Sequence, residues 1–164
     1  MQIILMGVSG SGKTAVGLLL SKHLGIPFQD GDDLHPKSNV AKMSAGVPLT
    51  DEDRWPWLDL CAWELIKPGG AIVACSALKR SYRDRIKARA EEAIFVHLDG
   101  SSELLFERLS NRKGHFFKKE MLQSQLDTLE PLQPDENGFS VDISGSEDQV
   151  ATQVLSRLQA IGRL

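Results

Sequence analysis

The chain has 164 residues, 41% of them hydrophobic and 25% charged, which suits one domain with a real core and leaves no length for a second. Its net charge of −3 comes from interspersed acidic and basic residues, and this disfavours a nucleic-acid partner. Without a long apolar run or a leader pattern, the sequence predicts no membrane partner and a cytoplasmic location. Cys61 and Cys75 fit no metal spacing, so we expect reduced, buried thiols.

A strand followed by a glycine-rich loop opens the chain. Residues 2–6 form the predicted strand, in which 3–6 are apolar, and residues 7–14 match the pattern G-x-x-x-x-G-K-[ST]. Backbone N–H groups of such a loop surround a polyphosphate, Lys13 reaches the terminal phosphates, and Thr14 ligates Mg²⁺. A flexible turn is the alternative, but it would not need Lys and Thr at its end. The predicted site for a nucleoside triphosphate comprises Gly7, Val8, Ser9, Gly10, Ser11, Gly12, Lys13 and Thr14.

The next segment predicts a helix over 12–24 and a strand over 26–30 that ends in an acidic turn. Carboxyl ends of parallel strands line the ligand sites of α/β proteins. Asp32 lies in this turn, where a carboxylate can hold a metal-bound water or orient an attacking hydroxyl. A helix N-cap is the alternative role, and we assign it to Asp33. His35 follows the turn, and a site role and a structural role are equally open for it.

The middle of the chain continues the alternation of helices and apolar strands. Thr50 begins a capping box, which predicts a helix over 51–67. A continuously apolar strand over 71–75 and a basic helix over 78–92 follow, and a fourth strand covers 94–98. The tryptophans of the first of these helices are expected to pack in the core: Trp55, Trp57 and Trp63.

The last third begins with a helix from 101 or 102 to about 111, and a basic, aromatic segment at 112–119 that we expect to be mobile. Five strands joined by right-handed helical crossovers make a three-layer α/β/α sandwich with a five-stranded parallel sheet, whose ligands gather at the carboxyl ends of the strands. The remaining predicted elements are a helix at 119–126, a loop at 130–138, a strand at 140–143 and a helix at 147–161.

Two arginines lie where they can converge on one acidic substrate. Arg54 is one turn into its helix, and Arg80 lies just beyond the third strand. Guanidinium groups bind carboxylates in a bidentate manner, although each residue taken alone is more often a solvated surface charge. For the neighbouring Lys79 and Arg83, a place on the solvated face of a basic helix is as consistent with the sequence as a role in the site.

Other basic residues leave two interpretations open. Arg108 and Arg112 share a helix face, which suits one guanidinium over an adenine ring and one on the phosphates, or an ordinary exposed face. His115 lies in the basic segment, where a site role and a structural role are equally open. His23 and His97 are expected to be structural.

Longer motifs carry a family resemblance. The residues GVSGSGKT at 7–14, DGDDLHP at 30–36, GVPLTD at 46–51, CSALKR at 75–80 and RKGHFF at 112–117 resemble those of the gluconate kinases. This resemblance covers almost the whole chain. It implies a P-loop NTPase fold of the nucleoside-monophosphate-kinase type, related to shikimate and adenylate kinases, with a helical lid at about 112–126.

The resemblance also implies a reaction and residue roles. ATP would phosphorylate the primary C6 hydroxyl of D-gluconate, with ATP and Mg²⁺ as cofactors and a homodimer as the assembly. Lys13 and Arg112 would offset developing charge, Asp32 would orient or deprotonate the acceptor hydroxyl, and Thr14 would bind Mg²⁺, with Asp32 reaching it through water. Arg108 would face the adenine. The implied gluconate ligands are Asp32, His35, Arg54, Arg80, His115 and Gln125.

Two other functions stay open at this point. A kinase for shikimate or another sugar acid would share the phosphate-binding loop, Asp32 and the lid. A nucleotide-binding regulatory module would leave Asp32, Arg54 and Arg80 without a role.

Overall fold

The computed structural model describes residues 1–112 and 119–164. Its five strands form one parallel sheet in the order β2-β3-β1-β4-β5. The α/β architecture with a five-stranded parallel sheet is therefore confirmed. The strands are β1 (Gln2–Met6), β2 (Phe28–Asp30), β3 (Ala71–Ala74), β4 (Ile94–Asp99) and β5 (Gly138–Asp142).

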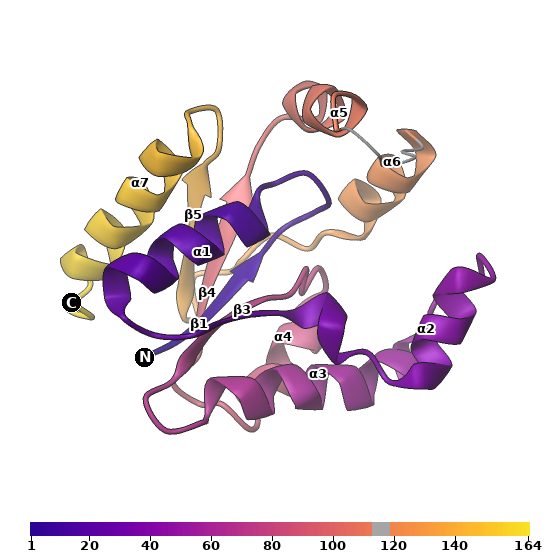
Figure 1. The fold of residues 1–164 in the computed structure, drawn as a ribbon, viewed down its shortest axis with the longest axis horizontal. Helices are drawn as coiled ribbons and strands as arrows, with labels where there is room; N and C mark the ends of the chain where they lie inside the picture. Colours follow the sequence, from indigo (N-terminus) through magenta and orange to yellow (C-terminus); the bar gives the residue numbers. More distant parts are fainter. Residues whose placement is uncertain (113–118) are drawn as a thin grey trace.

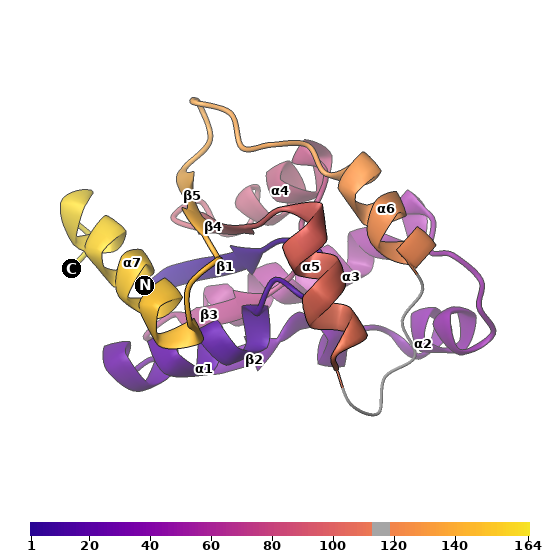
Figure 2. The same ribbon diagram turned by 90° about the horizontal axis from the view of Figure 1, so that it is seen from above.

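Helices cover both faces of the sheet and its carboxyl edge. α1 and α7 pack together on one face, and α3 and α4 pack together on the other (Figure 1). Seen from above, α2, α5 and α6 gather at the end toward which the strands point (Figure 2). The helices are α1 (Lys13–Leu24), α2 (Lys37–Ser44), α3 (Asp51–Leu65), α4 (Arg80–Lys87), α5 (Ser102–Ser110), α6 (Lys119–Thr128) and α7 (Glu147–Ala160), with a 3₁₀ turn, η1, at Gly31–Leu34.

The core has two halves because the side chains of a strand alternate between the faces of a sheet. Ile3 and Leu5 of β1 point into the half beneath α1 and α7, whereas Ile4 and Met6 point into the half beneath α3 and α4. All four side chains are fully buried. This burial on both faces explains why the central strands are continuously apolar.

Local signals set several boundaries as expected. α1 begins after Gly12 and ends at Gly25, both in the left-handed conformation that favours glycine. The Thr50 side chain accepts from the backbone N–H of Asp53, and the Asp53 carboxylate accepts from that of Thr50, so the predicted capping box is present. Both cysteines are free and buried, as expected.

Other boundaries differ from the prediction. The predicted cap at Asp33 implied a helix after it, but no bounds were predicted for α2, which is eight residues long and has the polar Asn39 as its one buried residue. Asp33 caps no helix: Asp30 caps η1, and Pro36 occupies the N-cap position of α2. The predicted basic helix at 78–92 is shorter in the structure, where α4 spans only Arg80–Lys87.

Burial in the structure excludes one interpretation that the sequence left open and contradicts one prediction. Arg83 is not part of a solvated helix face, since only 1% of it is exposed. Trp63 is 52% exposed and does not pack in the core, whereas Trp57 is buried.

Within the described parts of the chain, no helix is both long and apolar enough to span a membrane.

A buried ion pair ties α4 to the loop before β5. Arg83 Nε donates to Glu136 Oε1 at 2.6 Å, and the same guanidinium donates to the carbonyl oxygens of Ala77 and Leu78. Burial alone would raise the pKa of Glu136, but the hydrogen bonds from Arg83 and from the Gln133 backbone hold it below its ordinary value. The pair therefore holds the segment after β3 against this loop.

Replacing Glu136 with alanine is expected to lower the free energy of unfolding by about 3–5 kcal/mol, because it leaves the Arg83 cation buried without a partner. The pKa of Glu136 is depressed in the folded state, so its contribution is present above pH 4.5 and is lost as the pH falls through the folded pKa. Urea unfolding at pH 7 and pH 4 measures both effects. Asp135→Ala is the matched control, since its pair with Arg80 is exposed and should contribute at most about 1 kcal/mol. Equal losses in the two variants would contradict the assignment.

Candidate active site

The glycine-rich loop wraps around the side chain of its own lysine. Lys13 Nζ donates to the carbonyl oxygens of Gly7 at 2.9 Å and Val8 at 3.1 Å. Gly7 has φ +145°, and a Cβ atom there would lie 2.8 Å from Ser11 Oγ, so the loop needs glycine at this position. Burial lowers the pKa of Lys13, and Asp32 counteracts that shift. The loop thus keeps a cation at the carboxyl end of β1.

The chemistry of this loop fits a nucleotide and its metal ion. Ser11 Oγ is buried and has no hydrogen-bond partner among the described residues, and a phosphate oxygen would accept its hydrogen. Thr14 Oγ1 lies 3.4 Å from Asp30 Oδ2, which places a hydroxyl and a carboxylate side by side. Such oxygen donors are the kind that Mg²⁺ prefers. The residues present therefore fit Mg-ATP.

The acidic turn after β2 is built on a tightly packed glycine. A Cβ atom at Gly31 would lie 2.3 Å from the carbonyl oxygen of Ala74, and the Gly31 carbonyl accepts from Trp57 Nε1 at 2.7 Å. The backbone N–H of Asp32 donates to the Asp30 side chain at 3.0 Å. These contacts hold the turn against β3 and α3, and so determine the position of the Asp32 backbone.

Asp32 lies in an unusual electrostatic setting. Partial burial raises the pKa of its carboxyl, the charge of Asp30 raises it further, and Lys13 and His35 oppose the rise. Lys13 and this carboxylate are therefore close enough to influence each other. A carboxylate with a raised pKa beside a phosphate site is suited to accept a proton from a hydroxyl group.

An aromatic and basic wall continues the site from Asp32 toward α3. The His35 ring stacks on Trp57 with centroids 4.2 Å apart and an interplanar angle of 15°. Arg54 donates to the Leu49 carbonyl at 2.6 Å, and its guanidinium lies 5.5 Å from the centre of the Tyr82 ring. Arg54, Trp57 and Tyr82 border a cleft with an empty volume of about 510 Å³, including its open mouth. Its lining is Arg54, Trp57, Ser76, Leu78, Tyr82, Ser124, Gln125 and Thr128.

Gln125 closes this cleft on the side of α6. Its Oε1 accepts from the Ser9 backbone N–H at 2.7 Å, and its Nε2 donates to Ser9 Oγ at 3.0 Å. The amide thus joins α6 to the phosphate-binding loop while it lines the cleft. The predicted lid at about 112–126 is described only at Arg112 and from residue 119, and α6 extends two residues beyond it to Thr128.

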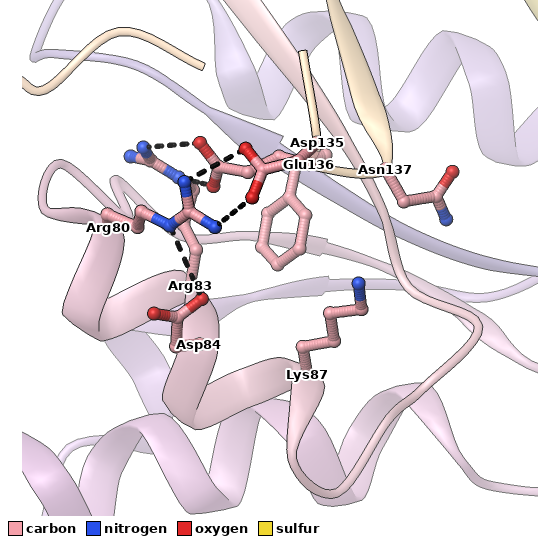
Figure 3. A pocket seen from close by; sticks show the side chains of 8 residues that line it. Arg80, Arg83, Asp84, Lys87, Asp135, Glu136 and Asn137 are labelled. Atoms are coloured by element: carbon pink, nitrogen blue, oxygen red, sulfur yellow. Dashed lines mark hydrogen bonds and ion pairs between the residues drawn. The ribbon is translucent and has the colours of Figure 1, made fainter. Parts of the chain in front are cut away.

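The structure does not bring Arg80 into this cleft. Its guanidinium forms two hydrogen bonds with the carboxylate of Asp135, at 3.0 and 2.6 Å, and lies 3.9 Å from Asp84. Figure 3 shows Arg80 and Asp135 in a separate, small pocket that also contains the Arg83–Glu136 pair. The hydrogen bond from Arg80 to Asp135 raises the pKa of Arg80. Arg54 and Arg80 therefore occupy different pockets.

The remaining predicted site residues are Arg108, Arg112 and His115. Arg108 donates to the carbonyl oxygens of Ile143 and Gly145, in the turn after β5. Arg112 lies near enough to Lys13 for its charge to lower the lysine pKa. His115 lies outside the described residues.

Sequence reasoning missed several residues of the cleft wall. Ser76 follows β3 directly, and its position at a strand's carboxyl end was the signal that could have identified it. Tyr82 and Trp57 carried no such signal, since aromatic residues on helices usually pack in cores. Asn39 is buried and contacts His35, and its place beside the acidic turn became apparent only in the fold.

A parallel sheet with a phosphate-binding loop after β1, an acidic turn after β2 and an adjoining polar cleft defines a small P-loop kinase. The family model for shikimate kinase matches residues 9–159. Gluconokinase from Gluconobacter oxydans is 48% identical, with 96% of this chain and 91% of that protein covered. Thermosensitive gluconokinase from Escherichia coli is 42% identical, with 96% and 87% covered.

Solved structures agree with these relatives. The crystal structure of a gluconokinase from Sinorhizobium meliloti has a TM-score of 0.90 and 43% identity, with 98% of this chain and 92% of that chain covered. Shikimate kinase from Aquifex aeolicus, at 19% identity and a TM-score of 0.64, shares the fold. The chain belongs to the gluconokinase family.

Proposed function

We propose that the protein transfers the γ-phosphoryl group of ATP to the C6 hydroxyl of D-gluconate, giving 6-phospho-D-gluconate. The observation that carries this proposal is the continuous series of Lys13, Asp32, His35 and Arg54. Lys13 lowers the pKa of Asp32, and the charges of Asp32 and Arg54 both act on the pKa of His35, so these side chains lie near one another from the phosphate-binding loop to α3. Such a series connects a phosphate donor site with a site for an anionic, hydroxyl-bearing acceptor.

The nucleotide end would hold Mg-ATP on residues 7–14. Thr14 would hold Mg²⁺, with Asp32 reaching it through water, and the ion would supply positive charge at the phosphates. Lys13 and Arg112 bind the phosphate oxygens and offset the charge that develops during transfer, while Arg108 faces the adenine. Phosphoryl transfer needs mainly such positioning and charge neutralisation, because the protein contributes little covalent chemistry.

The acceptor end would bind gluconate between η1, α3 and α6. Asp32 accepts a hydrogen bond from the C6 hydroxyl and thereby orients its oxygen toward the γ-phosphate. Arg54 binds the carboxylate, and His35, His115 and Gln125 contact the polyol hydroxyls. Arg80 could join them only by leaving Asp135, so its part in gluconate binding requires a rearrangement of that pair.

A panel of acceptors tests the proposal. ADP release is measured by a coupled assay with Mg-ATP and each of D-gluconate, other aldonates and shikimate. We expect D-gluconate to give the highest kcat/KM and mass spectrometry to identify its 6-phosphate. Preference for shikimate or another acid would assign a different acceptor, and no acceptor-stimulated ADP release would support a nucleotide-binding regulatory module.

The two arginines are separated by substitution. Arg54→Ala is expected to raise the KM for gluconate by about tenfold or more, because it removes a charge-assisted hydrogen bond to the carboxylate, and to leave the KM for ATP nearly unchanged. Arg80→Ala tests whether the second guanidinium reaches gluconate: a similar rise places it in the site. A KM for gluconate close to wild type would keep Arg80 with Asp135. A larger effect of Arg54→Ala on ATP would move this residue to the nucleotide side.

The assembly and location complete the proposal. We propose a homodimer that works in the cytoplasm. The outer surface of α3 exposes apolar side chains that a second copy could cover, among them Leu60 and Trp63, which are 40% and 52% exposed. Light scattering on the eluted protein is expected to give twice the chain mass of 18.1 kDa. A mass equal to one chain would contradict the dimer.

A further inference from the structure

Asn39 of α2 is a buried polar residue that the proposed reaction does not use. Only 3% of it is exposed, and its Nδ2 atom donates to the Asp53 carbonyl at 2.9 Å. A backbone carbonyl can only accept, so the amide atom that faces it must be the nitrogen. This contact fixes the orientation of the Asn39 side chain.

The same nitrogen determines which hydrogen His35 carries. Asn39 Nδ2 also lies 3.2 Å from Nδ1 of His35. If Nδ1 carried a hydrogen, two donors would face each other, so Nδ1 must accept and the hydrogen of the neutral ring must lie on Nε2. Turning the ring over would replace this acceptor with a carbon atom. The stack on Trp57, whose Nε1 is bound to Gly31, holds the ring plane.

The surrounding charges agree with a neutral ring. Burial lowers the pKa of His35; Arg54 of α3 acts in the same direction, and Asp32 of η1 opposes both. A protonated ring would in addition bring an Nδ1–H against the Asn39 amide. Geometry and charge therefore favour one and the same form of this histidine.

We propose that Asn39 is a positioning residue that holds His35 in the Nε2–H form, so that the ring offers one fixed donor to a hydroxyl oxygen of the sugar acid. The part about the sugar acid rests on the proposed function. Arg54 would bind the carboxylate of the sugar acid, whereas the His35 donor would require an oxygen acceptor at one carbon of that molecule. Asn39 would thereby contribute to acceptor selectivity without touching the acceptor.

The first test identifies the tautomer by long-range ¹H–¹⁵N correlation NMR, which connects the carbon-bound ring hydrogens with the two ring nitrogens. It is recorded on the substrate-free protein at pH 8. His35→Asn identifies the His35 signals. We expect the Nε2–H pattern in the wild type. Asn39→Asp should place a hydrogen on Nδ1, because a carboxylate can only accept, and Asn39→Ala should give a mixture of forms. A purely structural role for Asn39 predicts no such reversal.

Lys42→Met is the matched control. Lys42 Nζ binds Asp53 Oδ2 at 2.7 Å, so the variant removes the other tether between α2 and the start of α3. It should keep the Nε2–H pattern. A wild type with Nδ1–H, or an Asn39→Asp variant that keeps the Nε2–H form, would overturn the proposal.

The second test is kinetic. Asn39→Ala is expected to raise the KM for gluconate about fivefold, the effect of one misdirected hydrogen bond, and to change the KM for ATP by less than about twofold. An unchanged KM for gluconate would refute the selectivity role. If the wild type failed to phosphorylate gluconate, the proposed function would fall, while the tautomer experiment would still decide what Asn39 does to His35.

Discussion

Lys13→Ala is expected to fold normally and to lose nearly all phosphoryl transfer, with kcat reduced by about a thousandfold or more. The ammonium group lies within the loop that would hold the phosphates, and removing one such preorganised donor costs about two to three orders of magnitude in comparable sites. Loss of a cation that also positions the γ-phosphate should exceed that range. ADP release at saturating gluconate and ATP measures the change.

The fold of this variant should survive because its stability does not depend on the charge. Burial already disfavours the charged form of Lys13, which is why its pKa is lowered. Thermal unfolding should therefore remain within a few degrees of the wild type. Lys22→Ala, an exposed position on the same helix, is the matched control and should keep full activity. A Lys13→Ala enzyme with wild-type turnover would remove the phosphate-binding role of the loop.

Asp32→Asn is expected to reduce kcat by about a hundredfold to ten-thousandfold, the usual contribution of a general base, while ATP still binds. The variant keeps the size of the side chain and removes the proton acceptor. Asp33→Asn is the matched control, because that residue is the neighbour of Asp32 in the same turn, is also exposed and has no proposed role. Binding of an ATP analogue, followed by fluorescence, should be similar in both variants.

The pH dependence gives an independent check on Asp32. Its pKa is raised above 3.8 in the folded protein, and only the deprotonated form can accept the hydroxyl proton. kcat/KM for gluconate should therefore fall as the pH is lowered through this raised pKa, and Asp32→Asn should lack that acidic limb. An acidic limb that persists in Asp32→Asn would assign it to another group and leave Asp32 as an orienting residue.

Sequence reasoning succeeded where the signal is local. The phosphate-binding loop can be identified from the sequence because it requires glycines with positive φ, a lysine and a threonine at fixed spacing. The capping box at Thr50 and the apolar strands β1 and β3 can also be identified from the sequence. Each depends on interactions between residues a few positions apart, or on burial of a whole strand.

The same reasoning failed where burial depends on distant partners. Arg80 and Arg83 lie on one turn of α4, and both could equally be exposed, bind substrate or pair internally. In the fold Glu136 buries Arg83, while Asp135 holds Arg80 away from the cleft. The sequence is equally ambiguous for Trp57 and Trp63, which lie on the same helix. In the fold Trp57 is buried and donates to the Gly31 carbonyl after β2, whereas Trp63 is exposed.

By itself, then, the sequence determined the five strands and most of the helices in chain order, the phosphate-binding loop, the acidic turn and, through its motifs, the family. Only the tertiary structure decided that the Asn39 amide contacts His35, that Gln125 joins α6 to Ser9, and that Arg54 and Arg80 occupy different pockets. The reason is physical: a motif encodes local backbone geometry, whereas the partner of a long polar side chain is chosen by what the packed elements bring within about 3 Å of its donor atoms.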